Sequence, residues 1–184
     1  MTMDVLVLNG FDEPDEIVST VTSTLEDGGH DVEAWDLADM GFRPFMSTEE
    51  RRAYHTNDNL LDPHAQRAAE VMHRIDGFVV CTPHRAFAVS PLIKGFLDRV
   101  LIPGVAFTFD DEGKLVPGLR HITRVGLAVR TPHNDAAIRR ARDGAHRFIL
   151  RTVRLNCAWN AKSTHVRVRP NETATPVASA FAAW

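Results

Sequence analysis

Two histidines and two arginines follow two separate apolar runs of the sequence, and their side chains could do chemistry together. They are His84, Arg85, Arg130 and His133. A histidine can act as a general acid or base near neutral pH, because its ordinary pKa is about 6.5. An arginine can hold a carboxylate or a phosphate through two parallel hydrogen bonds. These residue types predict a site for a small anionic or polar substrate, with His84, Arg85 and His133 as catalytic candidates.

A second group of charges stands in an early loop and has the opposite sign. It carries four carboxylates within five residues, Asp12, Glu13, Asp15 and Glu16. One interpretation is that these acids complement the dipole of the helix that follows them. Another is that they pair with Arg85 and Arg130, which would then be structural charges. The corresponding alternative for His84 and His133 is that they are solvent-exposed loop residues.

Acidic and basic residues are also separated along the whole chain, with the acids in the N-terminal part. Residues 1–62 carry 15 acids and 3 arginines, a net charge of −12, whereas residues 120–170 carry 12 Lys or Arg and 2 acids, a net charge of +10. A nucleic-acid partner is not expected, because the acidic half would repel a phosphate backbone. The arginines at 139–151 are expected on a solvated helix face, or docked on the acidic half of a partner subunit.

Composition and hydropathy pattern define the elements that must position these groups. The chain has 184 residues, 44% of them hydrophobic and 24% charged, which is typical of one globular domain, 1–184. Apolar runs predict strands at 5–8, 32–37, 78–81, 125–129 and 164–168. Helical spacing and capping residues predict helices at 14–27, 62–74, 91–100 and 134–152, with a small hairpin at 105–118.

Alternating strands and helices predict an α/β fold with a parallel sheet and right-handed crossovers. The first, third and fourth strands are the most continuously apolar, so we expect the order 2-1-3-4-5 with the second and fifth at the edges. Ligands of such sheets bind beyond the carboxyl ends of the strands, where the order reverses. The expected ligand loops are therefore 9–15, 82–90 and 130–135.

Two stretches carry a resemblance to a known family. Residues 90–107 read SPLIKGFLDRVLIPGVAF, and residues 29–47 include GHDVE, DL and MGFRPFMS. Together with the order of the elements over 4–133, they resemble the flavodoxin-like NAD(P)H:quinone oxidoreductases. The resemblance implies a flavodoxin-like three-layer sandwich, a homodimer, FMN or FAD as cofactor and NAD(P)H as co-substrate.

The resemblance also assigns the flavin to three loops of this chain. The residues that match those loops are Gly10, Phe11, Thr82, Pro83, His84, Arg85, Ala86, Phe87, Arg130, Thr131, Pro132 and His133. Each loop departs from the family pattern. The first is acidic where the family offers His, Ser and Asn or Thr to phosphates, the second has Arg85 and Ala86 in place of two aromatic residues, and the third has Pro132 in place of glycines.

The resemblance and the residues together leave three functions, of which the first is the one that the resemblance implies. The first is a flavin-dependent NAD(P)H oxidoreductase that passes a hydride to a quinone or similar small acceptor. The second is a flavin-free enzyme on the same fold that uses the histidines and arginines for acid–base chemistry. The third is a non-catalytic binding protein.

The remaining features narrow the setting of the protein. The sequence has no apolar run of membrane-spanning length, and its two cysteines, Cys81 and Cys157, lie in apolar runs, so we expect a cytoplasmic protein without a membrane partner or disulfide. No metal site is predicted, because five of the histidines have no spacing typical of ligands: His30, His55, His64, His73 and His121.

Overall fold

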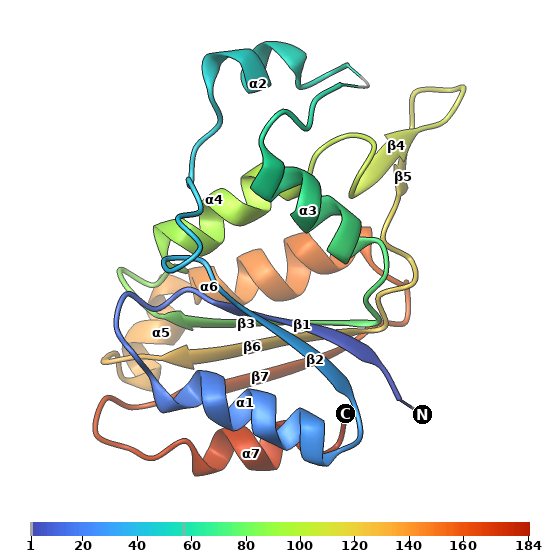
Figure 1. Ribbon diagram of the computed structural model, residues 1–184. Coiled ribbons are helices and arrows are strands. Elements are labelled where there is room, and N and C mark those ends of the chain that lie inside the picture. Colours follow the sequence, from blue (N-terminus) through green and yellow to red (C-terminus); the bar gives the residue numbers. More distant parts are fainter. Residues whose placement is uncertain (1, 57) are drawn as a thin grey trace.

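The fold has three layers, with a parallel sheet in the middle (Figure 1). A computed structural model describes residues 2–56 and 58–184. The sheet runs in the order β2-β1-β3-β6-β7, and its strands are Asp4–Asn9 (β1), Asp31–Asp36 (β2), Gly77–Pro83 (β3), Arg124–Arg130 (β6) and Lys162–Val168 (β7). This confirms the predicted flavodoxin-like three-layer sandwich. It also confirms the predicted order 2-1-3-4-5, in which the fourth and fifth strands are β6 and β7, because β4 and β5 form a separate hairpin.

Helices cover both faces of the sheet (Figure 1). One face carries α1 and α7, and the other carries α3, α4 and α6. The bounds are Glu16–Asp27 (α1), Thr48–Ala53 (α2), Pro63–Met72 (α3), Pro91–Val100 (α4), Asp135–Ala141 (α5), Gly144–Arg147 (α6) and Thr175–Phe181 (α7). The small hairpin is β4, Phe107–Phe109, with β5, Leu115–Pro117, as predicted.

The alternation of side chains in β7 shows which groups face which layer. Val166 and Val168 belong to the apolar cluster around α1 and α7. Successive strand residues point to opposite faces, so His165 and Arg167 face the layer that contains α6. This places a histidine of an edge strand beneath a helix rather than in solvent.

The segment 90–107, which carries the family resemblance, contains α4 and packs against the connection that follows β2. Gly95 of α4 lies so close to Pro44 that a Cβ would stand 2.1 Å from the Pro44 carbonyl oxygen. Arg99 is 1% exposed, donates to Glu50 and to the Arg43 carbonyl, and lies 3.3 Å from Asp62. The glycine and the arginine of this motif therefore hold the 43–62 connection on α4. Glu50 is fixed by α2, a helix that we did not predict, through a reciprocal cap with Ser47.

The prediction of one continuous helix over 134–152 is wrong, because the structure divides this segment into shorter helices. Its first part, α5, ends at Arg142 (φ 61°) and Asp143 (φ 40°), both in the left-handed region. The chain then restarts as α6, continues in a π-helical turn, Phe148–Thr152, and ends in a 3₁₀ turn, Val153–Asn156. The Asp143 carboxylate caps α6 by accepting from the His146 N–H at 3.0 Å, which stabilises the restart.

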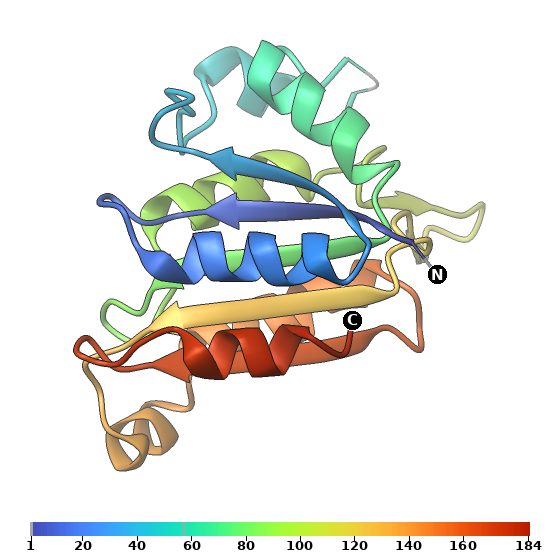
Figure 2. The same cartoon turned by 60° about the horizontal axis from the view of Figure 1, so that its bottom comes forward.

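The carboxyl ends of the five strands meet at one edge of the sheet, and the β4–β5 hairpin lies toward the opposite edge (Figures 1 and 2). The loops after β1, β3 and β6 therefore come together, as predicted for 9–15, 82–90 and 130–135. In the described residues, no helix has the length and apolar character needed to cross a membrane.

Candidate functional site

The loop after β1 is built around carboxylates that are already engaged. Asp15 is the N-cap of α1, and its Oδ1 accepts from the Ile17 N–H at 2.9 Å. The Arg130 guanidinium donates to both oxygens of the same carboxylate, from Nε at 2.5 Å and from Nη2 at 3.0 Å. Arg130 also donates to Glu16 and to the carbonyls of Arg169 and Glu172. Its donors are therefore taken up within the protein.

Arg85, which follows β3, makes the second cross-loop pair. Its Nη2 lies 2.8 Å from both oxygens of Asp12, although both side chains are more than half exposed. The guanidinium holds the pKa of the Asp12 carboxyl below its ordinary value. Asp12, Asp15, Glu16, Arg85 and Arg130 together are called the ion-pair cluster below. In this cluster both arginines make the ion pairs that the structural alternative expects.

The loop after β3 is a tight turn with unusual backbone angles. The Ala88 N–H donates to the Arg85 carbonyl at 2.9 Å, and the two residues between them, Ala86 and Phe87, have φ of 47° and 62°. Such a pair of positive φ angles normally calls for Gly or Asn. The turn is held from outside, because the Phe87 carbonyl accepts from the Ala145 N–H at 3.1 Å. The loop after β3 is thereby fixed to α6.

The two candidate histidines lie side by side, but they differ in exposure. The His84 side chain is fully buried, its Nδ1 lies 3.0 Å from Thr131 Oγ1, and burial lowers its pKa. His133 is half-buried, and its ring stacks on Phe87 with centroids 4.1 Å apart. The centroids of His84 and His133 are 5.8 Å apart. Only His133 of this pair could contact a substrate without a rearrangement, and His84 is a residue behind it.

The other residues assigned to the flavin are mostly structural. Gly10 faces α4, where a Cβ would stand 2.3 Å from Ile93, and Phe11 is buried in the core beside α1. The buried Thr82 hydroxyl accepts from the Ser90 N–H at the start of α4. Pro83 is partly buried at the end of β3, and Pro132 is exposed between Thr131 and His133.

Behind His84 lies a second group that the sequence analysis missed. Asp143, His146 and His165 each place a possible ligand atom within 4.8 Å of the other two. The Nε2 of His84 is 3.6 Å from Asp143 Oδ1. These four residues are called the histidine cluster below. Burial lowers the pKa of His165 to about 4, so its imidazole is neutral at physiological pH. The signal that was available is the Asp143-Gly144 dipeptide, a turn former inside a predicted helix.

The open space at this edge lies beside the ion-pair cluster. A cavity of about 750 Å³ runs along α1 and the end of β2, and no residue of loops 82–90 or 130–135 lines it. Its lining carries the carboxyl groups of Asp12, Glu13, Asp15, Glu16, Glu26, Asp36 and Asp39. A ligand there would meet a strongly negative potential.

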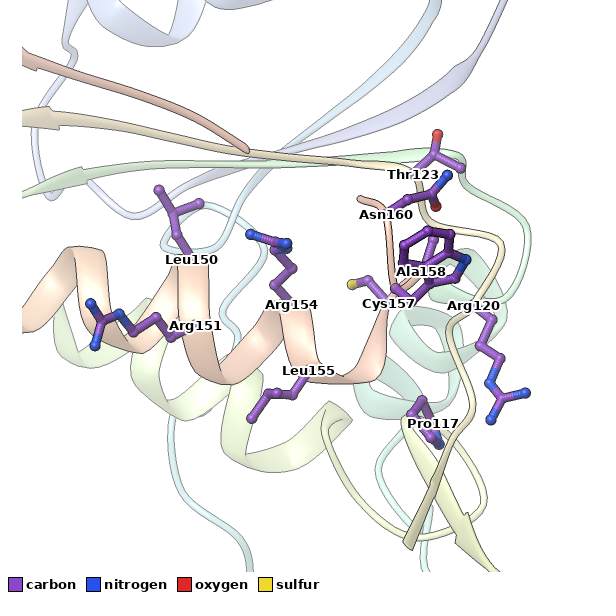
Figure 3. Close-up of a pocket in the computed structure, with 11 residues that line it drawn as sticks. Pro117, Arg120, Thr123, Leu150, Arg151, Arg154, Leu155, Cys157, Ala158 and Asn160 are labelled. Atoms are coloured by element: carbon purple, nitrogen blue, oxygen red, sulfur yellow. The ribbon is translucent and has the colours of Figure 1, made fainter. Parts of the chain in front are cut away.

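A larger cavity, of about 880 Å³, lies at the opposite edge, before β6 and β7 (Figure 3). Its lining combines the exposed side chains of Leu155 and Trp159 with Arg120, Arg151 and Arg154. Parallel sheets of this kind normally bind their ligands at the other edge, beyond the carboxyl ends of the strands.

These residues do not fit the phosphate of a flavin nucleotide. The amide groups at the start of α1 would be the natural anion site, yet the Asp15 carboxylate already accepts from one of them. Neighbouring carboxylates would repel a dianion, and both arginines are bound to acids. In addition, Phe87 and His133 stack face to face between the second and third loops. The start of α1 is therefore not a site for the phosphate of a resident flavin nucleotide.

Comparisons with solved structures find several proteins of the same fold. The NAD(P)H:quinone oxidoreductase from Methanothermobacter marburgensis is 18% identical, with a TM-score of 0.76 over 98% of this chain and 94% of that one. An FMN-dependent NADH-azoreductase from Bacillus anthracis str. Ames Ancestor is 14% identical, with a TM-score of 0.72 over 98% and 94%. Smu.1420 from Streptococcus mutans UA159 is 14% identical, with a TM-score of 0.80 over 99% and 100%.

These identities are low, so the structures show a common fold. No curated protein sequence matches the chain. The sequence profile of a protein family does match, over residues 3–159, and its description is a flavodoxin-like fold. The chain therefore belongs to this flavodoxin-like family.

Proposed function

We propose that the protein is an NAD(P)H oxidoreductase of the quinone-reductase type, which reduces a quinone or a similar small acceptor. In the net reaction NAD(P)H gives a hydride, a proton comes from solvent, and the quinone leaves as a hydroquinone. The observation that carries this proposal is membership of the flavodoxin-like family over residues 3–159. The fold is shared with a quinone oxidoreductase and an FMN-dependent azoreductase. The three loops at the carboxyl edge are the place for the reaction.

The ion-pair cluster adds a specific condition to this proposal. Because carboxylates occupy the start of α1, a flavin would have to bind through its ring, with no gain from a phosphate. FMN and riboflavin should then bind with similar affinity, whereas a phosphate-binding site would favour FMN. We therefore expect flavin to be lost during purification and to be required in the assay as an added component.

The test combines a binding measurement with turnover. Purified protein is titrated with FMN, FAD and riboflavin, and NADH and NADPH oxidation is followed with a quinone, with and without each flavin. Quinone-dependent oxidation that needs added flavin supports the proposal. Protein that binds no flavin and oxidises neither nucleotide contradicts it.

A second function is favoured by the same loop. Since the start of α1 excludes a nucleotide phosphate, the fold could serve a flavin-free enzyme in which His133 exchanges a proton with a small polar substrate. His84 would position the neighbouring loop through Thr131. Turnover without flavin, abolished in His133→Gln, would favour this function. This second function also requires that the wild type shows no NAD(P)H-linked turnover.

We also propose a cytoplasmic homodimer, as in the resemblance to the family. What supports the dimer is the separation of charge, with a basic segment at 139–154 and an acidic N-terminal third. The exposed Leu155 and Trp159 lie beside that basic segment. Sedimentation velocity at low and high salt tests this: a dimer that weakens with salt is expected, and a monomer in every buffer contradicts it.

A further inference from the structure

The histidine cluster joins groups that are far apart in the sequence. Asp143 is the N-cap of α6, His146 lies one turn later, and His165 lies in the middle of β7 on the face toward α6. His146 Nδ1 and His165 Nδ1 face each other at 3.0 Å. All three residues are half-buried, and one ligand atom from each lies within 4.8 Å of the others. A carboxylate and two imidazoles thus converge on one point.

The hydrogen bonds of this cluster are incomplete within the protein. A neutral imidazole has one N–H and one lone pair, so a hydrogen bond between the facing Nδ1 atoms needs one of them to donate to the other. The Nε2 of His165 is buried and has no hydrogen-bond partner among the residues described. Buried polar atoms are normally paired, which makes this arrangement unusual. If each ring instead carries its N–H on Nε2, both Nδ1 lone pairs face the same space, as a bound cation requires.

His84 also lies close to the Asp143 carboxylate. Its side chain is fully buried, its Nε2 is 3.6 Å from Asp143 Oδ1, and within the described part of the chain this nitrogen has no hydrogen-bond partner. Its Nδ1 lies 3.0 Å from Thr131 Oγ1. An Nδ1–H donated to that hydroxyl leaves the lone pair on Nε2, directed toward Asp143. His84 is therefore a neighbour of the Asp143 carboxylate, outside the three residues whose ligand atoms converge.

The backbone around Asp143 holds its carboxylate in place. Asp143 has φ of 40°, and a Cβ on the next residue, Gly144, would stand 2.5 Å from the Phe87 carbonyl oxygen. Asp143 Oδ1 accepts from the His146 N–H, and Oδ2 accepts from Arg167 Nη1 at 3.1 Å. Arg167 thus orients the carboxylate through one oxygen and leaves the other toward His84. Its positive charge limits the affinity for a cation but does not occupy the space between the imidazoles.

The donor set decides which cation could bind. Imidazole nitrogens suit Zn²⁺, Cu²⁺, Ni²⁺ and Fe²⁺, whereas Mg²⁺ and Ca²⁺ prefer oxygen ligands throughout. Three or four N and O ligands are also the number that Zn²⁺ takes in proteins. We propose that Asp143, His146 and His165 form a binding site for one Zn²⁺-type dication, with the fourth position open to water. This site is independent of the flavin question, because it lies behind the Phe87 turn and not in the loop after β1.

The experiment uses the full chain, purified without a histidine tag and stripped with a chelator. Zn²⁺ binding is measured by calorimetry, and Co²⁺ is added separately, because its visible spectrum reports nitrogen and oxygen ligands in a low-symmetry site. We expect one Zn²⁺ per chain in the wild type. The affinity should fall at least about tenfold in His146→Gln and again in His165→Gln. The exposed His55→Gln is the matched control and should bind as the wild type does.

Each outcome decides the proposal. A wild type that binds no Zn²⁺ in stoichiometric amount overturns it, whatever the variants do. Equal affinity in the wild type, His146→Gln and His55→Gln also overturns it, because the ion would then sit elsewhere. If His165→Gln does not fold, His146→Gln and the Co²⁺ spectrum of the wild type still decide the question. Mg²⁺ that competes with Zn²⁺ at equal concentration would contradict the assigned class of cation.

Discussion

The ion-pair cluster and the histidine cluster lie at the same edge of the sheet, but their polar groups are in opposite states. In the first, each arginine is matched by a carboxylate, and Asp15 is bound both by Arg130 and by the start of α1. In the second, His84 and His165 each keep a buried Nε2 without a partner among the described residues. Charged groups that satisfy one another hold the fold together, and groups left unsatisfied are the ones available to a ligand.

The contrast also shows why residue type alone is a poor guide to a binding site. Arg85 and Arg130 are the residues that would best hold an anion, yet the chain uses both as internal cross-links. His146 and His165 stand in segments that look like a solvated helix and an edge strand, yet their rings meet. The two clusters differ in the number of carboxylates near them. The loop after β1 supplies several carboxylates to the arginines, whereas the histidines of the other cluster have Asp143.

The largest expected effect concerns the backbone that builds the histidine cluster. Gly144→Ala should lower the free energy of unfolding by about 2–4 kcal/mol, because the new Cβ meets the Phe87 carbonyl oxygen. Gly29→Ala is the matched control: it has a positive φ but nothing near its Cβ, so it should cost only about 1 kcal/mol. Urea denaturation measures both. Equal costs would mean that the contact between α6 and the Phe87 turn does not fix this cluster.

The next effect breaks the ion-pair cluster at its centre. Asp15→Ala removes the cap of α1 and leaves the mostly buried Arg130 without its main partner, which should cost about 2–3 kcal/mol. Glu16→Ala removes an exposed partner of the same arginine at 3.4 Å and should change stability by less than about 0.5 kcal/mol. Thermal and urea denaturation test the pair. A small loss in Asp15→Ala would show that Arg130 finds other partners easily.

Much of the fold could be predicted from the sequence, because its signals are local. The apolar run at 78–81 and the Ser90-Pro91 cap each indicate their own element, and alternation of strand and helix then restricts the topology. The break at Arg142 has only a weak local signal, the Asp143-Gly144 dipeptide, because Arg142 itself rarely adopts positive φ. It depends on the contact of Gly144 with a turn more than fifty residues earlier.

The sequence predicts where the candidate site lies, but not what its residues do. The strand ends indicate correctly that His84, Arg85, Arg130 and His133 lie at one edge. The sequence left open whether the arginines pair with acids or bind a ligand, since Arg130 and Asp15 are 115 positions apart. The histidine cluster was missed because a continuous helix would place His146 on its solvated face.

A gain of binding would test whether carboxylates are what closes the first loop to phosphates. Asp12→Asn with Asp15→Asn keeps the cap of α1 and removes the carboxylate charge that each arginine pairs with through two hydrogen bonds, so the affinity for FMN relative to riboflavin should rise about tenfold. The matched control is Glu26→Gln with Asp39→Asn, which removes the same charge from the same cavity but away from the arginines. Fluorescence titration measures both ratios. An equal rise in the control would mean that general charge, not the paired arginines, excludes the phosphate.

The smallest effect concerns the most exposed pair. The pKa of Asp12 is lowered from its ordinary value of 3.8, so the ionised carboxylate favours the folded state. Its contribution is therefore present above that value and is lost as the pH falls through the lowered pKa. Because Asp12 and Arg85 are both exposed, Asp12→Asn should shift the melting temperature only slightly at pH 7 and low salt. The shift should vanish in 1 M salt, and also at a pH below the lowered pKa, whereas that of Asp15→Ala should persist in salt. A shift in Asp12→Asn that does not depend on salt would mean that the Asp12–Arg85 pair stabilises the fold as the partly buried Asp15–Arg130 pair does.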